Sequence, residues 1–290
     1  MRHLLAADRV RFGRRKDLWL LALLVPVILA VIFLSEFRGL TSPPQDDFFI
    51  DPPDPVLQAQ MHDQVMADFR LRVAQDLPAF AFPASLVKVA GNVVPLVLMA
   101  LYLATALIAG EFEWGTVRTL HLTSSRGRTL AVRLLVILGI MGAIAAAALL
   151  FAAVMPFFLS FEGKPLQGFA QPVPDLLPDI GTRLLVVVPF ISIPAFMAVL
   201  GRSTAVAFIL TLLFVVADLG ITGLPAWQDS PVPWLRVVTV SGSMTRLLGG
   251  EDATLAAIAP AFVSVVALAC WAIIPAVAAI GLFRRLDLNE

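Results

Sequence analysis

The chain has 290 residues, of which 59% are hydrophobic and only 14% are charged, and its mean hydropathy is +0.88. Soluble domains carry about a quarter charged residues, so this composition excludes a soluble globular domain and indicates an integral membrane protein. The formal net charge is zero, and the single cysteine, Cys270, excludes an intrachain disulfide and a cysteine metal cluster.

Residues 1–17 alternate basic and apolar side chains, a pattern typical of a helix that lies in the cytoplasmic membrane interface. Anionic membrane lipid would attract such a helix by about 1 kcal/mol per basic residue near the surface. Its direct tether to an apolar run favours lipid or a cytoplasmic subunit over nucleic acid as its partner. The run is long and lacks a small-residue cleavage site, so we expect a retained signal anchor.

Six apolar runs have the length of about 20 residues that a helix needs to cross the hydrocarbon core. We therefore predict an all-α integral membrane protein with one transmembrane domain over residues 1–290. The fourth and fifth runs are separated only by Gly-Arg-Ser-Thr, which predicts a tight helical hairpin. The predicted spans are 18–34, 86–109, 134–160, 184–200, 205–221 and 258–283.

Six spans place both termini on one side of the membrane, and the lysine and arginine distribution identifies that side. The four segments expected there carry 13 Lys and Arg against 6 Asp and Glu, whereas the rest of the chain carries 8 and 15. We expect the basic side, and with it both termini, to be cytoplasmic. Its segments are 1–17, 111–133, 201–204 and 284–290.

An outer segment, residues 35–85, begins as a loop rich in proline and aspartate and continues with apolar residues at helical spacing. This spacing predicts an extracytoplasmic amphipathic helix between the first two spans. It either packs on the outer ends of the spans or serves substrate gating or partner binding. The apolar positions are Leu57, Met61, Val65, Phe69, Val73 and Leu77.

A second outer segment, residues 222–257, mixes tryptophans with apolar pieces that are too short to cross the membrane. Trp227 and Trp234 suit the aromatic belt at the membrane interface. Two interpretations stay open: a surface loop, and a re-entrant segment whose backbone is covered by protein or water.

Known catalytic and nucleotide-binding patterns are missing from the sequence. There is no P-loop motif and no serine-hydrolase or zinc-protease motif, so ATP would have to be handled by another chain. The three histidines, His3, His62 and His121, are divided between the two sides, so no metal site is predicted.

Ionisable residues inside a membrane are the usual sign of function. Asp218 and Lys88 lie near the outer ends of their predicted spans, where their heads can reach the interface by snorkelling. The alternative for Asp218, together with Asn92, is a place on a substrate pathway. The predicted spans hold no carboxylate at mid-depth, which weighs against a proton-coupled carrier.

The polar stretch GEFEWGTVRTLHLTSSRGRT, residues 110–129, lies between the second and third spans. Glu111 and Glu113 are expected in the first turn of a short helix, whose positive end favours carboxylates. Trp114, Val117 and either Leu120 or His121 then recur on one face. The segment is either a lever that a cytoplasmic protein pushes or an ordinary capped loop.

The stretches GEFEWGTVRTL and SSRGRTLAVRLL resemble the membrane subunits of type 2 ATP-binding-cassette (ABC) exporters. In that family a Glu, a Gly-Thr pair, a Ser-Arg pair and a basic residue opening the third span form this segment. The ending GLFRRLDL, the basic amphipathic start and the six-span layout extend the resemblance over the whole chain. Arg133 stands where a lysine is more usual, which keeps the charge.

The resemblance implies that this segment is a coupling helix, which docks into a groove on a separate ATPase. Glu111 matches the family's acidic position, Gly115 and Thr116 its Gly-Thr pair, and Arg126 its Ser-Arg arginine. The residues expected to couple to the ATPase are Glu111, Glu113, Trp114, Gly115, Thr116, Arg118, Ser125 and Arg126.

By the same resemblance, the chain is a permease subunit that exports an amphipathic substrate such as a drug, lipid or peptide, from a bacterial or archaeal inner membrane. Its expected partners are two copies of a cytoplasmic ATPase, which carries ATP and Mg, a second permease chain, identical or related, and membrane lipids. The outer segment 35–85 is longer than in the simplest members, so the substrate is not carried over. The alternatives are a membrane-embedded enzyme and a structural or sensory membrane protein without transport.

Overall fold

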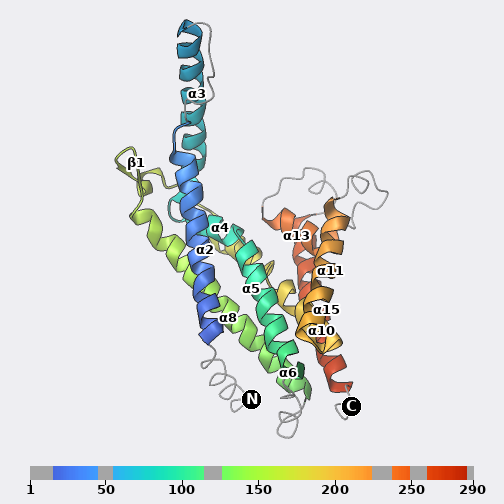
Figure 1. The fold of residues 1–290 in the computed structure, drawn as a ribbon. Coiled ribbons are helices and arrows are strands. Elements are labelled where there is room, and N and C mark those ends of the chain that lie inside the picture. The colour runs from blue at the N-terminus through green and yellow to red at the C-terminus, as the bar shows by residue number, and fades with distance from the viewer. Residues whose placement is uncertain (1–15, 45–54, 114–125, 224–236, 249–259, 286–290) are drawn as a thin grey trace.

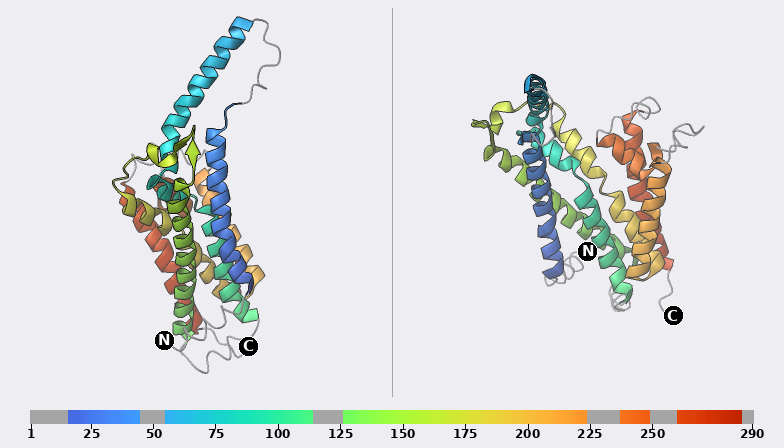
Figure 2. Two further views of the ribbon diagram at one scale, coloured as in Figure 1. Left: turned by 90° about the vertical axis from the view of Figure 1, so that its left-hand side faces the viewer. Right: turned by 45° about the horizontal axis from the view of Figure 1, so that its top comes forward.

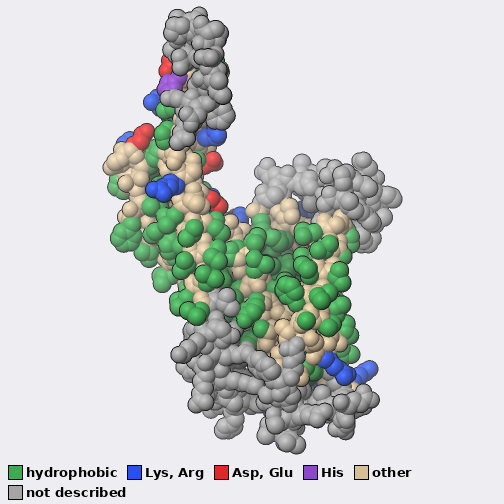
Figure 3. Space-filling model, in the orientation of Figure 1, with side chains coloured by type: hydrophobic (Ala, Val, Ile, Leu, Met, Phe, Trp, Pro, Cys, Tyr) green, Lys and Arg blue, Asp and Glu red, His purple; other side chains and the backbone are tan. Residues whose placement is uncertain are grey.

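The computed structural model describes residues 16–44, 55–113, 126–223, 237–248 and 260–285 (Figure 1). Nearly all of these residues are helical, and six helices are long and apolar enough to cross a membrane. A band of apolar side chains covers the middle of the molecule, and the visible charged side chains lie mostly beyond it (Figure 3). These features confirm the prediction of a helical, multi-pass membrane protein.

The described part of the first half of the chain consists of long helices joined by short turns. Its elements are α2 (Lys16–Thr41), α3 (Pro55–Asp76), η2 (Leu77–Phe80), α4 (Ala84–Gly91), α5 (Val94–Ala104), the π-helical turn η3 (Thr105–Ala109), α6 (Gly110–Glu113), α8 (Arg126–Val154) and η4 (Met155–Phe157).

The second half begins with a small antiparallel hairpin, in which Ser160 pairs with Pro165 and Phe161 with Lys164. Its elements are β1 (Ser160–Phe161), β2 (Lys164–Pro165), η5 (Leu166–Phe169), α9 (Leu176–Leu185), α10 (Pro189–Gly201), α11 (Thr204–Gly223), α13 (Val240–Leu247) and α15 (Ala261–Arg285).

Helix α2 begins and α15 ends at the same end of the bundle, here called the basal end, where α6 also ends and α8 begins (Figures 1 and 2). Helix α3, the β1–β2 hairpin and α13 lie at the opposite end, here called the α3 end. Helix α10 is central, because it packs on α15, α11 and α5 and most of its residues are buried.

The second span begins later than predicted, because the helix breaks after Gly91. Helix α4 ends there, and α5 starts anew at Val94 with Pro95 in its first turn, where the missing N–H costs no hydrogen bond. The candidate span is therefore Val94–Phe112, and Lys88 lies outside it on α4. The Lys88 ammonium pairs with the Glu36 carboxylate at 2.8 Å.

The third and fourth spans also differ from their predicted ends. The third extends two turns further toward the basal end, from Gly127. The fourth breaks between α9 and α10, where Val187 and Val188 form turn hydrogen bonds to Leu184 and Leu185. The tight hairpin between α10 and α11 is confirmed, with Arg202 in the left-handed conformation that often follows a helix end.

A helix between the first two spans is confirmed as α3, but it does not lie along the bundle. It projects beyond the rest of the bundle at the α3 end, and the side view shows it leaning at an angle to α2 (Figures 1 and 2). Only its last turns are packed: Val73 is buried, whereas Met61 and Val65 are exposed. The reason is that its contacts with α2 and η2 involve this end of the helix.

Part of the segment 222–257 is a packed helix. Helix α13 buries Val240 and Ser243 against α11 and α15, and the Trp271 indole donates a 2.8 Å hydrogen bond to the Val238 carbonyl. Trp227 and Trp234 lie outside the described residues.

A cluster of phenylalanines joins α2, η2 and α8. The fully buried Phe33 ring lies 5.2 Å from Phe80 and 6.1 Å from Phe151, centre to centre. Phe37 contacts the same Phe80 ring at 5.6 Å. Tilted and edge-on aromatic contacts of this kind add to the dispersion energy of close packing, which is what holds membrane helices together.

We therefore expect Phe33→Ala to lower the free energy of unfolding by about 3 kcal/mol, because it leaves a cavity between three elements. The measurement is thermal unfolding of the purified chain in detergent. Phe262→Ala is the matched control, since Phe262 is 65% exposed on α15. Equal shifts in the two variants would contradict the assignment of Phe33 to the core.

Candidate functional site

A buried ion pair joins the second and third spans near the basal end. Glu111 lies on α6, in the last described turn of a helix that runs unbroken from Val94, and Arg133 lies two turns into α8. The Glu111 carboxylate and the Arg133 guanidinium form an ion pair, with residue exposures of only 8% and 4%. The pair therefore fixes the end of one span against the next.

The burial of both charges makes this pair strongly interdependent. A charge is costly inside a bundle, and removing one partner of a buried pair costs about 3–5 kcal/mol because the other charge is left uncompensated. By contrast, the partly exposed pair of Lys88 and Glu36, near the α3 end, has side-chain exposures of 26% and 38%, so it contributes at most about 1 kcal/mol.

A π-helical turn brings the Leu107 carbonyl to the same arginine. Thr105–Ala109 form this turn, and Arg133 Nη1 donates to the Leu107 carbonyl at 3.3 Å. The Thr105 hydroxyl donates to the carbonyls of Leu101 and Tyr102 at 2.8 and 3.0 Å. Such turns carry an extra residue, disturb the regular hydrogen-bond ladder and are frequent at functional sites. Here a second span supplies one of the donors.

The last helix closes the same corner of the bundle. The Phe112 ring meets Phe283 of α15 edge-on, with centres 5.7 Å apart. The Arg284 side chain crosses Gly127 at the start of α8, so closely that a Cβ on Gly127 would overlap it. Gly127 is therefore a contact point where α15 reaches the helix that follows the polar segment.

We call Glu111, Phe112, Gly127, Arg133 and Phe283 the basal clamp. Its members bracket the polar segment: two precede it on α6, two follow it on α8, and one comes from α15. A force applied to the polar segment would reach three spans at once, because the clamp holds both of its ends.

The structure describes only the ends of the predicted coupling segment. Glu113 is the last residue of α6 and Arg126 the first of α8. The other expected coupling residues, Trp114, Gly115, Thr116, Arg118 and Ser125, lie outside the described residues. Glu111 does not open a new helix as predicted. It closes the second span, where its charge is offset by Arg133 instead of a helix N-terminus.

Asp218 caps a helix at the opposite end. Its buried carboxylate accepts backbone N–H bonds from Val240 at 3.0 Å and Ser241 at 2.7 Å, and the Ser241 hydroxyl donates to the Asp218 carbonyl. These N–H groups open α13, where helices favour a carboxylate. Asp218 thus anchors α13 to α11. Its carboxylate is buried in these hydrogen bonds, whereas the snorkelling prediction expected it to reach the membrane interface. Asn92 is half-buried at the break between α4 and α5, so the two predicted pathway residues are on different elements.

Sequence reasoning missed the pairing of Arg133 with Glu111 and the contact of α15 with the ends of the polar segment. An arginine within an apolar helix was a usable signal for the pairing, because it requires a partner. The contact of Phe283 and Arg284 with the polar segment's ends had no signal in the spacing, since 150 residues separate Phe283 from Arg133.

No protein-family model matches the chain. No curated protein matches it either.

We expect the Glu111–Arg133 pair to show a coupling energy of about 3 kcal/mol in a double-mutant cycle of Glu111→Leu, Arg133→Leu and the double variant. Each single change leaves a buried charge, whereas the double change leaves none. The measurement is the free energy of unfolding by denaturant in detergent.

The control is the same cycle on the partly exposed pair, with Glu36→Leu and Lys88→Leu, for which the coupling should stay below about 1 kcal/mol. Additive effects at Glu111 and Arg133 would show that the two charges do not stabilise one another.

Proposed function

We propose that the chain is the membrane-spanning permease subunit of an ATP-driven ABC exporter. The observation that carries the proposal is the basal clamp, which holds both ends of a polar segment resembling the coupling segment of type 2 ABC permeases. Six candidate spans support it, as does a Lys and Arg excess in the segments expected at that end. The basal end is then the cytoplasmic side.

In this mechanism a cytoplasmic ATPase binds the coupling segment and closes on ATP. Closure moves the segment, and the clamp passes the movement to α5 through α6, to α8 directly and to α15 through Phe112 and Phe283. The inward-facing and outward-facing states of the permease would differ in their contacts with the ATPase. ATP binding would therefore shift the population from the inward-facing toward the outward-facing state.

In this proposal the nucleotide is bound by the partner ATPase. The sequence of the chain contains no P-loop, so ATP and Mg belong to the partner, of which two copies are needed for a closing pair. A second permease chain would complete the pathway across the inner membrane. The chain itself performs no hydrolysis and contributes the path and the docking segment.

Co-expression with the neighbouring reading frames of its genome should yield a complex that contains a P-loop ATPase. We expect this ATPase in an equimolar ratio to the permease chain after affinity purification in mild detergent, measured by quantitative mass spectrometry. A purified chain with no ATPase would favour the alternatives, a membrane enzyme or a non-transporting membrane protein.

Gly115→Trp should abolish stimulation of the ATPase by the permease, because a bulky side chain would block close docking of the coupling segment. The measurement is ATP hydrolysis by the reconstituted complex relative to the ATPase alone. Gly39→Trp is the control: Gly39 is exposed on α2 at the α3 end, and a Cβ there meets no atom within 4 Å. Stimulation that survives Gly115→Trp would remove the coupling assignment.

A further inference from the structure

We propose that the headgroup of an anionic phospholipid binds at the basal end between α8 and α15, where its phosphate bridges Arg128 and Arg284. The site requires only that the chain crosses a membrane, so it does not depend on the exporter assignment. It is supported by the contact of Arg284 with Gly127, by the charge of this corner and by the exposed apolar residues next to both arginines.

The Arg284 side chain is held against the first turn of α8. A Cβ at Gly127 would overlap Arg284 Nε and would lie 3.1 and 3.2 Å from its Cγ and Cδ, so the arginine occupies the space that the glycine leaves empty. Arg128 directly follows this glycine, and both arginines are exposed. Two spans therefore contribute one cation each to the same corner of the bundle.

These cations have no neutralising partner in the described part of the chain. Neither Arg128 nor Arg284 forms an ion pair with a carboxylate there, and Arg285 adds a third exposed cation. Arg128 lies in the first turn of α8, where the positive end of a helix disfavours a cation, and that turn holds no acidic residue. Figure 3 shows exposed basic side chains at the basal end, whereas the visible acidic side chains lie toward the α3 end. The corner therefore favours a bound anion.

Exposed apolar side chains continue from both arginines along their helices. Leu135 lies seven residues from Arg128 on α8, which is close to two full turns and hence the same face, and it is 51% exposed. Val277 has the same relation to Arg284 on α15 and is 62% exposed. In a membrane such faces contact hydrocarbon, and a guanidinium at their end lies at the depth of the headgroups. The corner thus presents charge and apolar surface in the order in which a phospholipid presents phosphate and acyl chains.

The chemistry of the two side chains selects an anionic lipid. Arginine binds phosphate oxygens with paired, charge-assisted hydrogen bonds, and basic groups near the membrane surface attract anionic lipids. A phosphatidylcholine headgroup carries a quaternary ammonium group as well, which the same arginines repel. The site therefore distinguishes an anionic from a zwitterionic phospholipid by its net charge.

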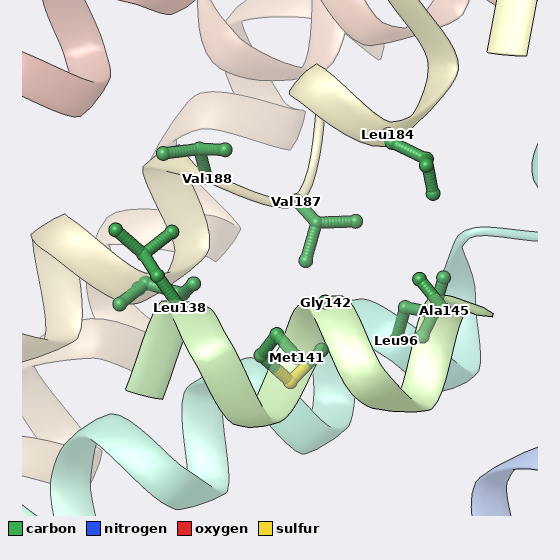
Figure 4. Close-up of a pocket in the computed structure, with 9 residues that line it drawn as sticks. Leu96, Leu138, Met141, Gly142, Ala145, Leu184, Val187 and Val188 are labelled. Carbon is green, nitrogen blue, oxygen red and sulfur yellow. The ribbon is translucent and has the colours of Figure 1, made fainter. Parts of the chain in front are cut away.

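The apolar hollow halfway along α8 provides no such distinction. Figure 4 shows Val187 and Val188 across from Leu138 and Gly142, and every side chain that lines this hollow is apolar. A headgroup would lose its hydrogen bonds to water there without replacement. On α8, the selection between lipids therefore falls to the arginines at the basal end.

The test uses the full chain, delipidated in detergent and without ATPase. Native mass spectrometry measures its affinity for dioleoylphosphatidylglycerol and for dioleoylphosphatidylcholine. We expect the wild type to bind one phosphatidylglycerol about tenfold more tightly than phosphatidylcholine. Arg128→Gln and Arg284→Gln should each remove most of this preference, because each deletes one charge-assisted contact. Unchanged binding of phosphatidylcholine shows that the variants are folded.

Matched variants separate this site from a general attraction to basic side chains. Gly127→Ala keeps every charge but displaces Arg284, so it should weaken binding of phosphatidylglycerol about fivefold. Gly139→Ala lies on the same helix with no atom within 4 Å of its Cβ, and it should have no effect. Arg202→Gln removes an exposed arginine from the turn between α10 and α11, and it should leave this affinity unchanged too.

Equal losses in all three arginine variants, with none in Gly127→Ala, would reveal diffuse charge attraction and overturn the proposal. Displacement of the lipid by glycerol 3-phosphate or inorganic phosphate would assign the corner to a soluble anion instead. Phosphatidylglycerol binding that survives Arg284→Gln, in a chain that no longer binds its ATPase, would assign Arg284 to an acidic protein surface.

The absence of ATPase from the lipid measurement separates this site from the exporter assignment. The expected lipid preference in a chain that recruits no ATPase would retain the site and remove the exporter. Normal ATPase coupling in a chain that binds both lipids equally would retain the exporter and remove the site.

Discussion

A charge inside a membrane bundle has to be paired, and the Glu111–Arg133 ion pair is where this constraint shapes the molecule. The pair sits between two spans that are joined through a polar segment, so its geometry fixes how that segment leaves and re-enters the bundle. The π-helical turn adds the Leu107 carbonyl to the same guanidinium, and α15 covers the corner through Phe283. The basal clamp is therefore a set of packed and paired side chains at the end of otherwise apolar helices.

Several polar side chains elsewhere in the bundle lie where helices break or begin. The Asp218 carboxylate accepts hydrogen bonds from the first N–H groups of α13. The Arg183 guanidinium donates to the carbonyl of Leu248, the residue that follows α13. Ser85 on α4 donates to the Ala152 carbonyl near the end of α8. Lipid offers no hydrogen bonds to backbone groups at such breaks, so side chains or neighbouring helices have to supply them. These three side chains thus stabilise points where helices of the fold begin or end.

Much of the architecture could be predicted from sequence, because length and apolar content alone define a candidate span. All six predicted runs correspond to candidate spans, and the outer helix and the hairpin at residues 201–204 were predicted too. The ends were less predictable: hydropathy measures side chains, whereas the breaks at Gly91 and Val187 depend on backbone hydrogen bonds and packing. The clamp requires partners from three elements: Glu111 and Arg133 were singled out in the sequence, but their pairing and the contribution of α15 were not.

The π-helical turn also has a consequence for comparing this chain with others. One residue of an α-helix corresponds to about 100° of rotation, so the extra residue in Thr105–Ala109 sets the rotational phase of everything that follows it in the span. Without it, the same residues would direct Glu111 away from α8. A homologous span with a regular helix would carry its acidic residue one position earlier. Alignment of the two sequences would then need a one-residue gap inside the membrane, where gaps are ordinarily forbidden.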